Sequence, residues 1–529
     1  MTFQRTSRRP LLRIAAAAGA LLALAAPLAA QDPGFKPDVA VIQLNDVYRI
    51  DAVANGAAGG LGRVSTLVDR ARSDAGGAPV VLVHSGDFIA PSLESRYFGG
   101  LQMIAAMNFL ATRAPLIAIP GNHEFDEKAP GMLAGALSAS HFPWLAGNVA
   151  VHTGDAAADA RMGRDTVVTW GGMKVGIFTV TFLDSPRDYA TVDADHVASA
   201  ERQIRELEAR GVDAVIGITH LEIAEDRRIA RLRRAHPRLL WIAGGHEHFL
   251  EREELTDTTA LITKGDSNAR RVWEVFMARG PSGPRIFARP VVMDASVAVD
   301  PAYEHQVRDV WSARLREKLP FVDARIGTAS QPLDGREETV RDAESNWGSW
   351  LADQMRGAFP DLRADVAVLN GGAIRIDDVF SGSIRWEHLA RTFGFPTRVG
   401  LVWLRGRDLR QTVLEQGVSG GRGEGRFLQV SGLRFRFDRA RPVGQRVLDV
   451  QVPAGTGWAT LDDDRVYIVA VPDYMYAGGD GYSFKLRAIQ SVAPGPDLKY
   501  LAFDALTAAY ARGEAIAPVV EGRVVEVKH

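Results

Sequence analysis

Residues 116–126 read Leu-Ile-Ala-Ile-Pro-Gly-Asn-His-Glu-Phe-Asp and join a short apolar run to a dense group of polar side chains. Leu116–Ile119 is typical of a buried strand, because it is brief, apolar and followed by Pro and Gly. Directly after it, residues 121–126 gather an amide, an imidazole and two carboxyl groups. Such a concentration of polar groups is unfavourable unless it is used, so this segment predicts a functional loop at the end of a strand.

The same pattern recurs on both sides of this segment, from about residue 36 to 285. Helical stretches such as Leu61–Arg72 and His196–Arg210 alternate with short apolar runs. Buried strands are predicted at Val39–Leu44, Pro79–Val83, Leu116–Ile119, Lys174–Val180, Ala214–Ile218 and Leu239–Ala243. This alternation predicts an α/β domain with helices covering a sheet, and ligands gather beyond the carboxyl ends of the strands in such sheets.

Four further polar clusters follow predicted strands in this part of the chain. They are Asn45-Asp46-Val47-Tyr48, Gly86-Asp87, Thr219-His220 and Gly244-Gly245-His246-Glu247-His248. Each cluster alone is a weak signal, because a single histidine at a strand end is usually a structural residue. The Gly-His-x-His cluster is stronger, since it puts two imidazoles on the same side of an extended segment, as metal chelation requires.

The composition limits the chemistry that these clusters can perform. The chain of 529 residues has no cysteine, which excludes disulfides, iron–sulfur clusters, thiolate zinc sites and cysteine nucleophiles. Its 62 basic and 64 acidic residues give a net charge of −2, so no basic excess exists for binding a nucleic-acid polymer. Any metal must therefore be held by imidazole, amide, carboxylate, phenol or backbone groups.

Taken in order, the five clusters resemble those of the calcineurin-like metallophosphoesterases. The resemblance implies two metal ions, for which Zn, Mn and Fe all suit oxygen and imidazole ligands. One ion would be held by Asp46, Asp87 and His248, and the other by Asp87, Asn122, His220 and His246, with Asp87 bridging ions about 3.5–4 Å apart. His123 would donate to the phosphoryl oxygens or the leaving group and would be oriented by Asp126.

Tyr48 departs from the family pattern, in which the first motif is Asp-x-His. Three interpretations remain open. Tyr48 is a phenolate ligand that favours a hard ion such as ferric iron, a neutral phenol beside a metal with three protein ligands and water, or a packing residue in a domain that has lost one metal and its activity.

The second half of the chain changes character after a helical linker predicted at 299–325, which Asp300-Pro301 opens. Helices are predicted at Asn346–Phe359, His388–Phe393 and Gly406–Gln416, and strands at Leu433–Phe437, Val447–Val452 and Arg465–Val471. We therefore expect a metallophosphoesterase α/β sandwich over 36–298 and a separate α+β domain over 326–529.

This second domain resembles the nucleotide-binding domain of the 5′-nucleotidase family, which includes bacterial UDP-sugar hydrolases and ecto-5′-nucleotidases. The matching stretches are Glu344–Gly348, Leu369–Arg375, Phe427–Gly432 and Tyr474–Tyr482. The resemblance implies that substrate is bound by Arg341, Asn370, Gly372, Arg375, Phe395, Tyr474 and Asp480. The guanidinium groups and the Gly-Gly turn would hold phosphate, the two aromatic rings would stack on the base, and Asp480 would bind ribose hydroxyls.

Two differences limit how far the family's substrate-binding residues can be carried over to this chain. Residues 392–398 read Thr-Phe-Gly-Phe-Pro-Thr-Arg where the family usually has Pro-Phe-x-Asn, and the second aromatic is Tyr rather than Phe. From the residues alone, Phe395 and Tyr474 are also compatible with plain core packing, and Gly478–Gly481 with a simple hairpin turn.

Residues 1–30 are predicted to be a cleavable export signal, because arginines at 5, 8, 9 and 13 precede an apolar, Ala-rich run. The stretch from Ser7 to Arg13 resembles the twin-arginine motif. We therefore expect a periplasmic or secreted protein whose mature chain has no membrane span.

The expected activity is release of phosphate from nucleoside 5′-monophosphates by attack of a metal-activated hydroxide. The alternatives on the same scaffold are a 2′,3′-cyclic phosphodiesterase, a UDP-sugar hydrolase and a thiosulfohydrolase. A non-catalytic nucleotide-binding protein is the alternative from a different class.

Overall fold

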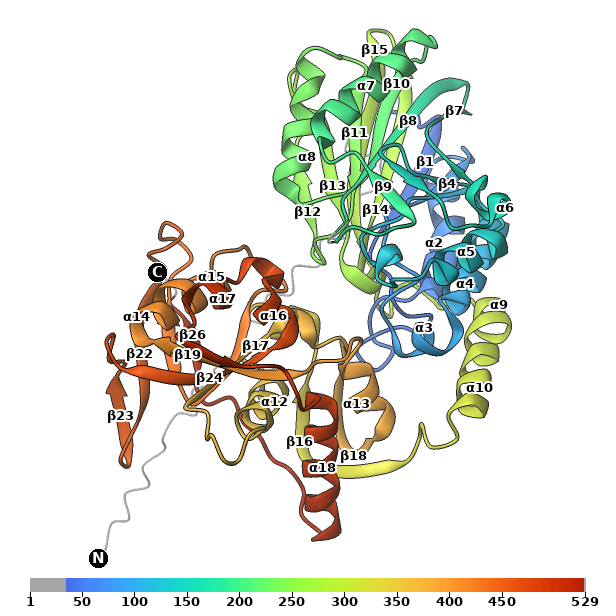
Figure 1. Ribbon diagram of the computed structural model, residues 1–529. Coiled ribbons are helices and arrows are strands. Elements are labelled where there is room, and N and C mark those ends of the chain that lie inside the picture. The colour runs from blue at the N-terminus through green and yellow to red at the C-terminus, as the bar shows by residue number, and fades with distance from the viewer. Residues whose placement is uncertain (1–34, 184, 528–529) are drawn as a thin grey trace, which may run out of the picture. The chain divides into compact units, whose positions relative to one another are not determined.

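The computed structural model describes residues 35–183 and 185–527, so the predicted export signal at 1–30 lies outside the described residues. Two β-sheets form the centre of the first domain (Figure 1). In sheet order, the seven-stranded sheet consists of β15 (Gly283–Val292), β14 (Arg271–Gly280), β1 (Val39–Leu44), β2 (Val80–His84), β3 (Leu116–Ala118), β4 (Trp144–Leu145) and β6 (Met162–Gly163).

The second sheet of this domain has six strands. In sheet order they are β12 (Glu251–Glu253), β13 (Leu261–Lys264), β11 (Leu239–Gly244), β10 (Ala214–His220), β8 (Met173–Thr181) and β7 (Thr166–Trp170). A small antiparallel pair, β5 (Val149–Val151) and β9 (Ala190–Val192), lies outside both sheets.

The two sheets pack against each other through alternate residues of their strands, because successive side chains point to opposite faces. Val39 and Val41 of β1 share one buried cluster with Ile216 and Ile218 of β10. The intervening Val215 belongs to a different cluster, on the helix-covered face of the second sheet. Both faces of the strands are therefore buried, which explains their nearly continuous apolar sequences.

Helices cover the outer faces of this sandwich (Figure 1). Ala200, Ile204 and Leu207 of α7 recur at helical spacing and pack against the second sheet. The helices of the domain are α2 (Leu61–Asp74), α3 (Leu93–Phe98), α4 (Leu101–Arg113), α5 (Gly131–Ala139), α6 (Ala156–Asp159), α7 (His196–Ala209) and α8 (Ile223–Ala230).

The parallel strands determine where the polar clusters lie. Strands β1, β2 and β3 run parallel to one another, and so do β8, β10, β11 and β13. Each predicted cluster follows the carboxyl end of one of these strands, so the clusters meet at one edge of the sandwich. The prediction of an α/β sandwich is confirmed.

A helical segment leads to the second domain. It consists of α9 (Pro301–Tyr303), a turn of π-helix (Glu304–Arg308) and α10 (Asp309–Lys318). The Asp300 side chain caps its first turn by accepting a hydrogen bond from the backbone N–H of Ala302 at 2.8 Å.

The second domain contains a five-stranded sheet that is buried on both faces. Val366 and Val368 belong to one core cluster, and the alternating Ala367 and Leu369 belong to the other. In sheet order the strands are β20 (Leu428–Ser431), β17 (Val366–Asn370), β24 (Val466–Pro472), β19 (Val399–Arg405) and β25 (Gln490–Val492).

Smaller sheets and helices cover the two faces of this sheet. The four-stranded sheet is β23 (Gly457–Thr460), β22 (Val447–Ala454), β21 (Arg434–Phe437) and β26 (Val524–Glu526), and the remaining pair is β16 (Arg325–Asp334) with β18 (Val379–Arg385). The helices are α11 (Glu337–Val340), α12 (Asn346–Arg356), α13 (Trp386–Thr392), α14 (Gly406–Asp408), a π-helical turn (Leu409–Leu414), α15 (Glu415–Gly417), α16 (Asp473–Ala477), α17 (Phe484–Arg487) and α18 (Leu498–Ala511).

Two features differ from the sequence prediction. Helix α12 ends at Arg356 rather than Phe359, because Gly357 disfavours helix and Pro360 restricts the residue before it. The hairpin β14–β15 completes one edge of the first sheet, although its polar and apolar residues gave no clear strand signal. No helix among the described residues is long and apolar enough to span a membrane.

Candidate active site

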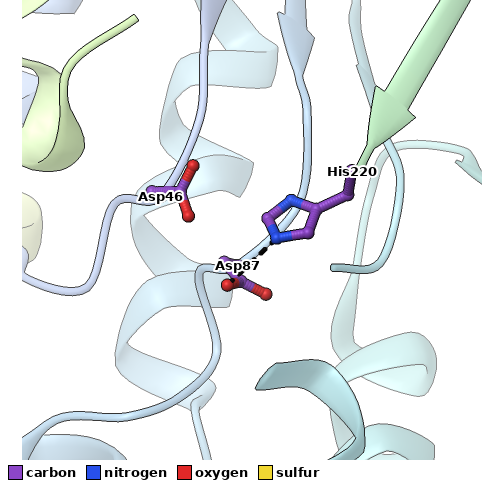
Figure 2. Close-up of side chains that lie close together, drawn as sticks. All are labelled: Asp46, Asp87 and His220. Carbon is purple, nitrogen blue, oxygen red and sulfur yellow. Dashed lines mark ion pairs between the residues drawn. The ribbon is translucent and has the colours of Figure 1, made fainter. Parts of the chain in front are cut away.

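Three predicted ligands form the centre of the site. One ligand atom each from Asp46, Asp87 and His220 lie within 4.8 Å of one another, and all three residues are buried (Figure 2). They follow or end strands β1, β2 and β10, which belong to both sheets. The sandwich therefore brings together carboxylate and imidazole groups that are up to 174 positions apart in sequence, as metal coordination requires.

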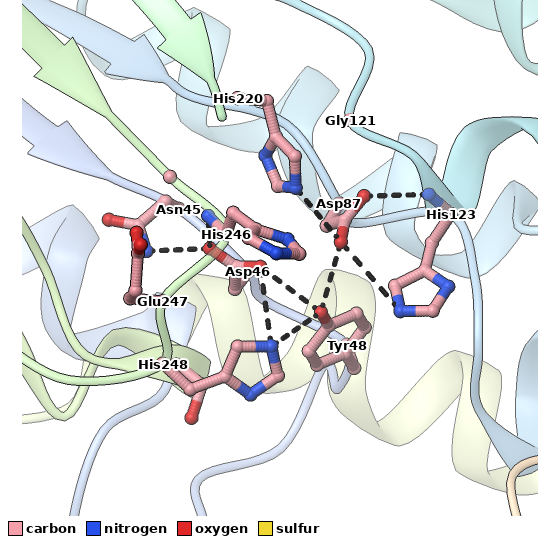
Figure 3. A network of polar contacts seen from close by, with 12 residues as sticks. Asn45, Asp46, Tyr48, Asp87, Gly121, His123, His220, His246, Glu247 and His248 are labelled. Carbon is pink, nitrogen blue, oxygen red and sulfur yellow. Dashed lines mark hydrogen bonds and ion pairs between the residues drawn. The ribbon is translucent and has the colours of Figure 1, made fainter. Parts of the chain in front are cut away.

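The Asp87 carboxylate contacts His220, Tyr48 and His123 (Figure 3). Its Oδ2 lies 3.2 Å from Nε2 of His220 and 3.3 Å from the Tyr48 hydroxyl, and its Oδ1 accepts the backbone N–H of His123 at 2.9 Å. The carboxylate thus faces both halves of the predicted ligand set, which is the position that a bridging ligand needs.

His220 is held in the orientation that a ligand requires. Its Nδ1 donates to the carbonyl of Ser85 at 2.7 Å, so its Nε2 points to Asp87 and, at 3.0 Å, to Oδ1 of Asn122. Fixing one ring nitrogen with a carbonyl selects the tautomer in which the other is available to a metal.

The histidines of the Gly-His-x-His cluster lie on either side of Asp46. Nε2 of His248 is 3.4 Å from Asp46 Oδ1, whereas the backbone N–H of His246 donates to Asp46 Oδ2 at 2.9 Å. The His246 ring lies 5.5 Å from the His220 ring and forms a contact at 3.7 Å with Glu222. The His248 ring therefore lies against Asp46, whereas the His246 ring lies beside His220 and Glu222.

Tyr48 lies inside the ligand cluster. Its hydroxyl is 3.1 Å from Asp46 Oδ1, 3.3 Å from Asp87 Oδ2 and 3.0 Å from Nε2 of His248. Burial, followed by the charges of Asp87 and Asp46, raises the pKa of this phenol well above 10. In the metal-free protein Tyr48 is therefore a neutral hydroxyl that donates to carboxylates.

The turns that carry the ligands are tight. Asp46, Asp87 and His246 have φ values of 54°, 62° and 84°, in the left-handed region that non-glycine residues rarely adopt. A Cβ on Gly121 would lie 2.1 Å from Oδ1 of Asp87, which explains the glycine that opens the 121–126 loop. Backbone strain at three ligand positions is a signature of a functional site.

His123 and Asp126 form the predicted pair. Nδ1 of His123 contacts Asp126 Oδ2 at 2.9 Å, and its Nε2 lies 3.8 Å from Asp87 Oδ2. Burial lowers the pKa of His123, but the Asp126 and Asp87 carboxylates outweigh this effect and raise the pKa to about 9. The imidazole is therefore protonated at neutral pH and is suited to donate a hydrogen bond or a proton.

Sequence reasoning assigned no role to Glu124, which fixes the Asp87 loop. Its carboxylate accepts backbone N–H groups from Asp87, Phe88, Ile89 and Gly121 at 2.5–3.0 Å. The one feature of the sequence that could have indicated this role is the position of Glu124 in the Gly-Asn-His-Glu sequence.

Lys264 is a second residue that sequence reasoning missed. This fully buried ammonium group donates to the carbonyls of Leu221 and Gly245 at 2.6 and 2.9 Å. Ion pairs with Asp226, at 2.7 Å, and with Glu247 balance its charge. Leu221 follows His220 and Gly245 precedes His246, so Lys264 ties together the two loops that carry these ligands.

His84 lies beneath the ligand loops as a neutral group. Neither of its ring nitrogens has a hydrogen-bond partner among the described residues, and its ring packs 4.6 Å from that of Phe88. Burial lowers the pKa of His84 to about 3. The unfolded chain therefore binds one more proton than the native chain over the range between about pH 3 and 6.5.

We expect His84→Leu to reduce the loss in the free energy of unfolding that accompanies a fall in pH below 6.5. Because His84 has a lowered pKa, the folded protein loses stability as the pH falls below 6.5, by up to about 1.4 kcal/mol per pH unit from this residue. Urea unfolding of metal-free protein between pH 7 and 4 measures the slope. The exposed His305→Leu should leave the slope unchanged, and parallel curves for His84→Leu and wild type would contradict the assignment.

The predicted phosphate-binding arginines lie close to the ligand cluster. Cζ of Arg375 is 5.6 Å from the Tyr48 ring centre and 5.7 Å from the Phe395 ring centre. Buried N–H groups of Arg375 (Nε and Nη1) and of Arg341 (Nε) have no hydrogen-bond partner among the described residues. Unpaired buried guanidinium donors beside a metal cluster are suited to an anionic ligand.

Two of the remaining predicted substrate residues, Asn370 and Tyr474, contact Asp480. Its carboxylate accepts from Asn370 Nδ2 at 2.9 Å and from the Tyr474 hydroxyl at 3.1 Å. Phe395 stacks on the His123 ring at 5.7 Å, and the backbone N–H of Gly372 donates to the Gly425 carbonyl at 2.8 Å. Phe395 thus adjoins the catalytic pair, and Tyr474 adjoins Asp480.

Two regions of the chain match known families. Residues 39–250 match the calcineurin-like phosphoesterase family, and residues 325–486 match the 5′-nucleotidase C-terminal domain. The chain therefore belongs to the calcineurin-like metallophosphoesterases that carry a 5′-nucleotidase C-terminal domain, and it is a metal-dependent phosphoester hydrolase.

Individual relatives agree with this class. The chain is 27% identical to the trifunctional nucleotide phosphoesterase protein YfkN of Bacillus subtilis over 93% of its own length, although it spans only 35% of that protein. It is 24% identical to the 5′-nucleotidase of Bos taurus, covering 98% of this chain and 94% of that protein.

Solved structures extend the likeness. The 5′-nucleotidase precursor of Thermus thermophilus superposes with a TM-score of 0.75 and 25% identity, covering 93% of this chain and 99% of that one. The sulfate thiohydrolase SoxB of the same organism has a TM-score of 0.68 and 16% identity, covering 93% and 97%, and therefore shares the fold alone.

The Asp46–Asp87–His220 cluster fits a bound metal ion. Burial opposes a charge on His220, yet Asp87 outweighs it and raises the pKa of His220 to about 10. In the metal-free protein a protonated imidazole thus balances the buried carboxylates. The cluster requires positive charge, and divalent ions held by oxygen and imidazole groups supply it.

Proposed function

We propose that this protein hydrolyses nucleoside 5′-monophosphates to nucleosides and phosphate. The observation that carries the proposal is the pair of partly unpaired arginines, Arg341 and Arg375, beside the Asp46–Asp87–His220 cluster. A small and highly charged anionic group, such as a terminal phosphate, could contact both the guanidinium donors and the metal ions that this cluster would hold.

The proposed ligand set is that of the sequence analysis. Asp46, Asp87 and His248 would hold one ion, and Asp87, Asn122, His220 and His246 the other. Two bound ions polarise a phosphoryl group and lower the pKa of a water molecule, which supplies a nucleophile at neutral pH. Side chains of the protein would orient the phosphate and supply the proton for the departing group.

Three groups of the protein act on the phosphate. Arg341 and Arg375 orient its oxygens, and the protonated His123 donates to a phosphoryl oxygen or to the departing ribose oxygen. Asp126 holds the His123 ring by its Nδ1 and stabilises the imidazolium form. Donors fixed before the reaction stabilise the charge that develops in the transition state.

The nucleoside is proposed to contact Asp480 and the two aromatic residues. Asp480 would accept hydrogen bonds from the ribose hydroxyls, because its carboxylate has further acceptor capacity beyond Asn370 and Tyr474. Tyr474 is half exposed, and its ring is proposed to stack on the base. Stacking of this kind contributes about 1–3 kcal/mol per base.

A substrate panel tests this proposal. Purified protein loaded with Mn²⁺ or Zn²⁺ is expected to release phosphate from AMP and other 5′-monophosphates with a higher kcat/KM than from 2′,3′-cyclic AMP, a UDP-sugar or a cysteine S-sulfonate. A preference for one of the last three would replace the nucleotidase with another hydrolase on the same fold. Tight AMP binding without turnover would identify a nucleotide-binding protein instead.

We propose that Tyr48 is a neutral phenol beside the metal rather than a phenolate ligand, since its hydroxyl lies within hydrogen-bond distance of both Asp46 and Asp87. Tyr48→Phe is therefore expected to retain two metal ions and to lower kcat by less than about tenfold. A visible absorption band in the iron-loaded protein that Tyr48→Phe abolishes would identify a phenolate–iron bond and contradict the assignment.

Export by the signal at 1–30 also remains a proposal. Fractionation of cells that express the full chain is expected to find the mature protein outside the cytoplasm, and replacement of Arg8 and Arg9 by lysine should retain the precursor inside.

A further inference from the structure

Glu337 is a buried acid of the second domain that contacts a predicted metal ligand of the first. One of its carboxylate oxygens, Oε2, accepts from His248 Nδ1 at 2.9 Å and from the Ser267 hydroxyl at 2.5 Å. The side chain is almost completely buried. No motif in the sequence analysis singled out this residue, which belongs to helix α11.

The other oxygen of the same carboxylate faces the substrate side. Oε1 accepts from Nη2 of Arg341 at 3.0 Å, and the Arg270 guanidinium lies 3.8 Å from Oε2. Glu337 therefore contacts both neighbours through its two carboxylate oxygens.

The contact with His248 has a direct consequence for metal binding. With Nδ1 donating to a carboxylate, the lone pair of His248 is on Nε2, which lies 3.4 Å from Asp46 Oδ1. Removing a group that fixes the tautomer of a ligating histidine in this way weakens metal binding by about 10–100-fold.

The contact with Arg341 has the opposite consequence for substrate. A phosphate that binds Arg341 competes with Oε1 of Glu337 for the same guanidinium. A carboxylate that strengthens the metal site therefore also restrains a residue that the proposed function uses to hold phosphate.

We propose that Glu337 is a positioning residue that couples the metal site of the first domain to the phosphate-binding arginine of the second. The inference rests on the proposed function only for the role of Arg341. Because coupling free energies are reciprocal, ligation at either end changes affinity at the other.

The test compares Glu337→Gln with wild type in two binding measurements that need no turnover. Affinity for Mn²⁺ alone, measured by calorimetry or chelator competition, is expected to fall at least tenfold. Affinity of the metal-free protein for AMP is expected to remain unchanged or to increase, because Arg341 loses a charged partner. Glu338→Gln is the matched control, since Glu338 is exposed on the same helix, and it should change neither affinity.

If Glu337→Gln lowers the affinity for Mn²⁺ but not the affinity for AMP, the result reflects coupling between the two sites and not damage to the fold. An Mn²⁺ affinity within threefold of wild type would overturn the proposal, as would a parallel loss of Mn²⁺ and AMP affinity together with a lower Tm. If Glu337→Gln does not fold, Glu337→Asp keeps the charge but withdraws it by one methylene group. Its Mn²⁺ affinity should fall at least threefold, and wild-type affinity would overturn the proposal. If Mn²⁺-loaded wild-type protein neither binds nor hydrolyses AMP, the proposed function fails, but the Mn²⁺ measurement still decides the role of Glu337.

Discussion

Replacement of Asp87 by alanine is expected to lower kcat for nucleoside monophosphates by at least about 10³-fold, equivalent to about 4 kcal/mol of transition-state stabilisation. Asp87 is the acid whose two oxygens contact His220, Tyr48 and the His123 backbone. Its loss removes the one carboxylate proposed to bind both ions, and it also removes the acceptor that holds the His123 loop.

The Asp87→Ala experiment needs a metal count as well as a rate. Elemental analysis should find fewer than two ions per chain in the variant. Asp69→Ala is the matched control, because Asp69 is an exposed acid paired with Arg72 and Arg113, and it should retain full activity and both ions. Wild-type activity in Asp87→Ala would contradict the dinuclear site.

Replacement of His123 by alanine is expected to lower kcat by about 10²–10⁴-fold while the metal content stays at wild-type level. His123 contacts Asp126 and lies near Asp87 but is proposed to bind no ion. A loss confined to kcat, with KM nearly unchanged, identifies an interaction made only in the transition state.

The pH dependence of His123→Ala provides an independent check. Because the pKa of His123 is raised to about 9, its protonated form predominates at neutral pH and is lost as the pH rises through about 9. Metal ions bound at Asp87 would offset that carboxylate and shift this transition to lower pH. Wild-type activity should therefore fall on the alkaline side, and His123→Ala should lack this limb. An identical alkaline limb in both proteins would contradict the role of His123.

Asp126→Asn separates orientation from proton donation. The amide keeps the approximate shape of Asp126 but cannot stabilise the imidazolium charge, so a smaller loss of about tenfold and a shift of the alkaline limb to lower pH are expected. The two variants together assign the limb to the His123–Asp126 pair.

The strands and the polar clusters were predictable from the sequence because both are local signals. Val39–Leu44 is identical in prediction and structure, and β10 and β11 differ from the predicted ranges by one or two residues at one end. Parallel pairing then brings the strand ends to one edge, so residues as distant as Asp46 and His220 could be expected to meet. The presence of an α/β sandwich followed by a second domain is confirmed for the same reason.

The supporting residues could not be predicted, because their partners are remote in sequence and carry no motif. Lys264 looks like an ordinary charged end of a strand until the fold buries it against the loops of His220 and His246. Glu337 is one acid among several in a polar stretch, and only tertiary structure brings it to His248. The detailed contacts of Phe395 and Tyr474 likewise depend on how helices and loops pack.

The measurement that tests the central claim most directly is phosphate release from AMP before and after chelation, with the metal content determined on the same samples. Chelated protein should be inactive, and activity should return with added Mn²⁺ or Zn²⁺ as the metal content rises to two ions per chain. Undiminished hydrolysis by metal-free protein, or no phosphate release from AMP with two ions bound, would contradict the assignment of this chain as a metal-dependent 5′-nucleotidase.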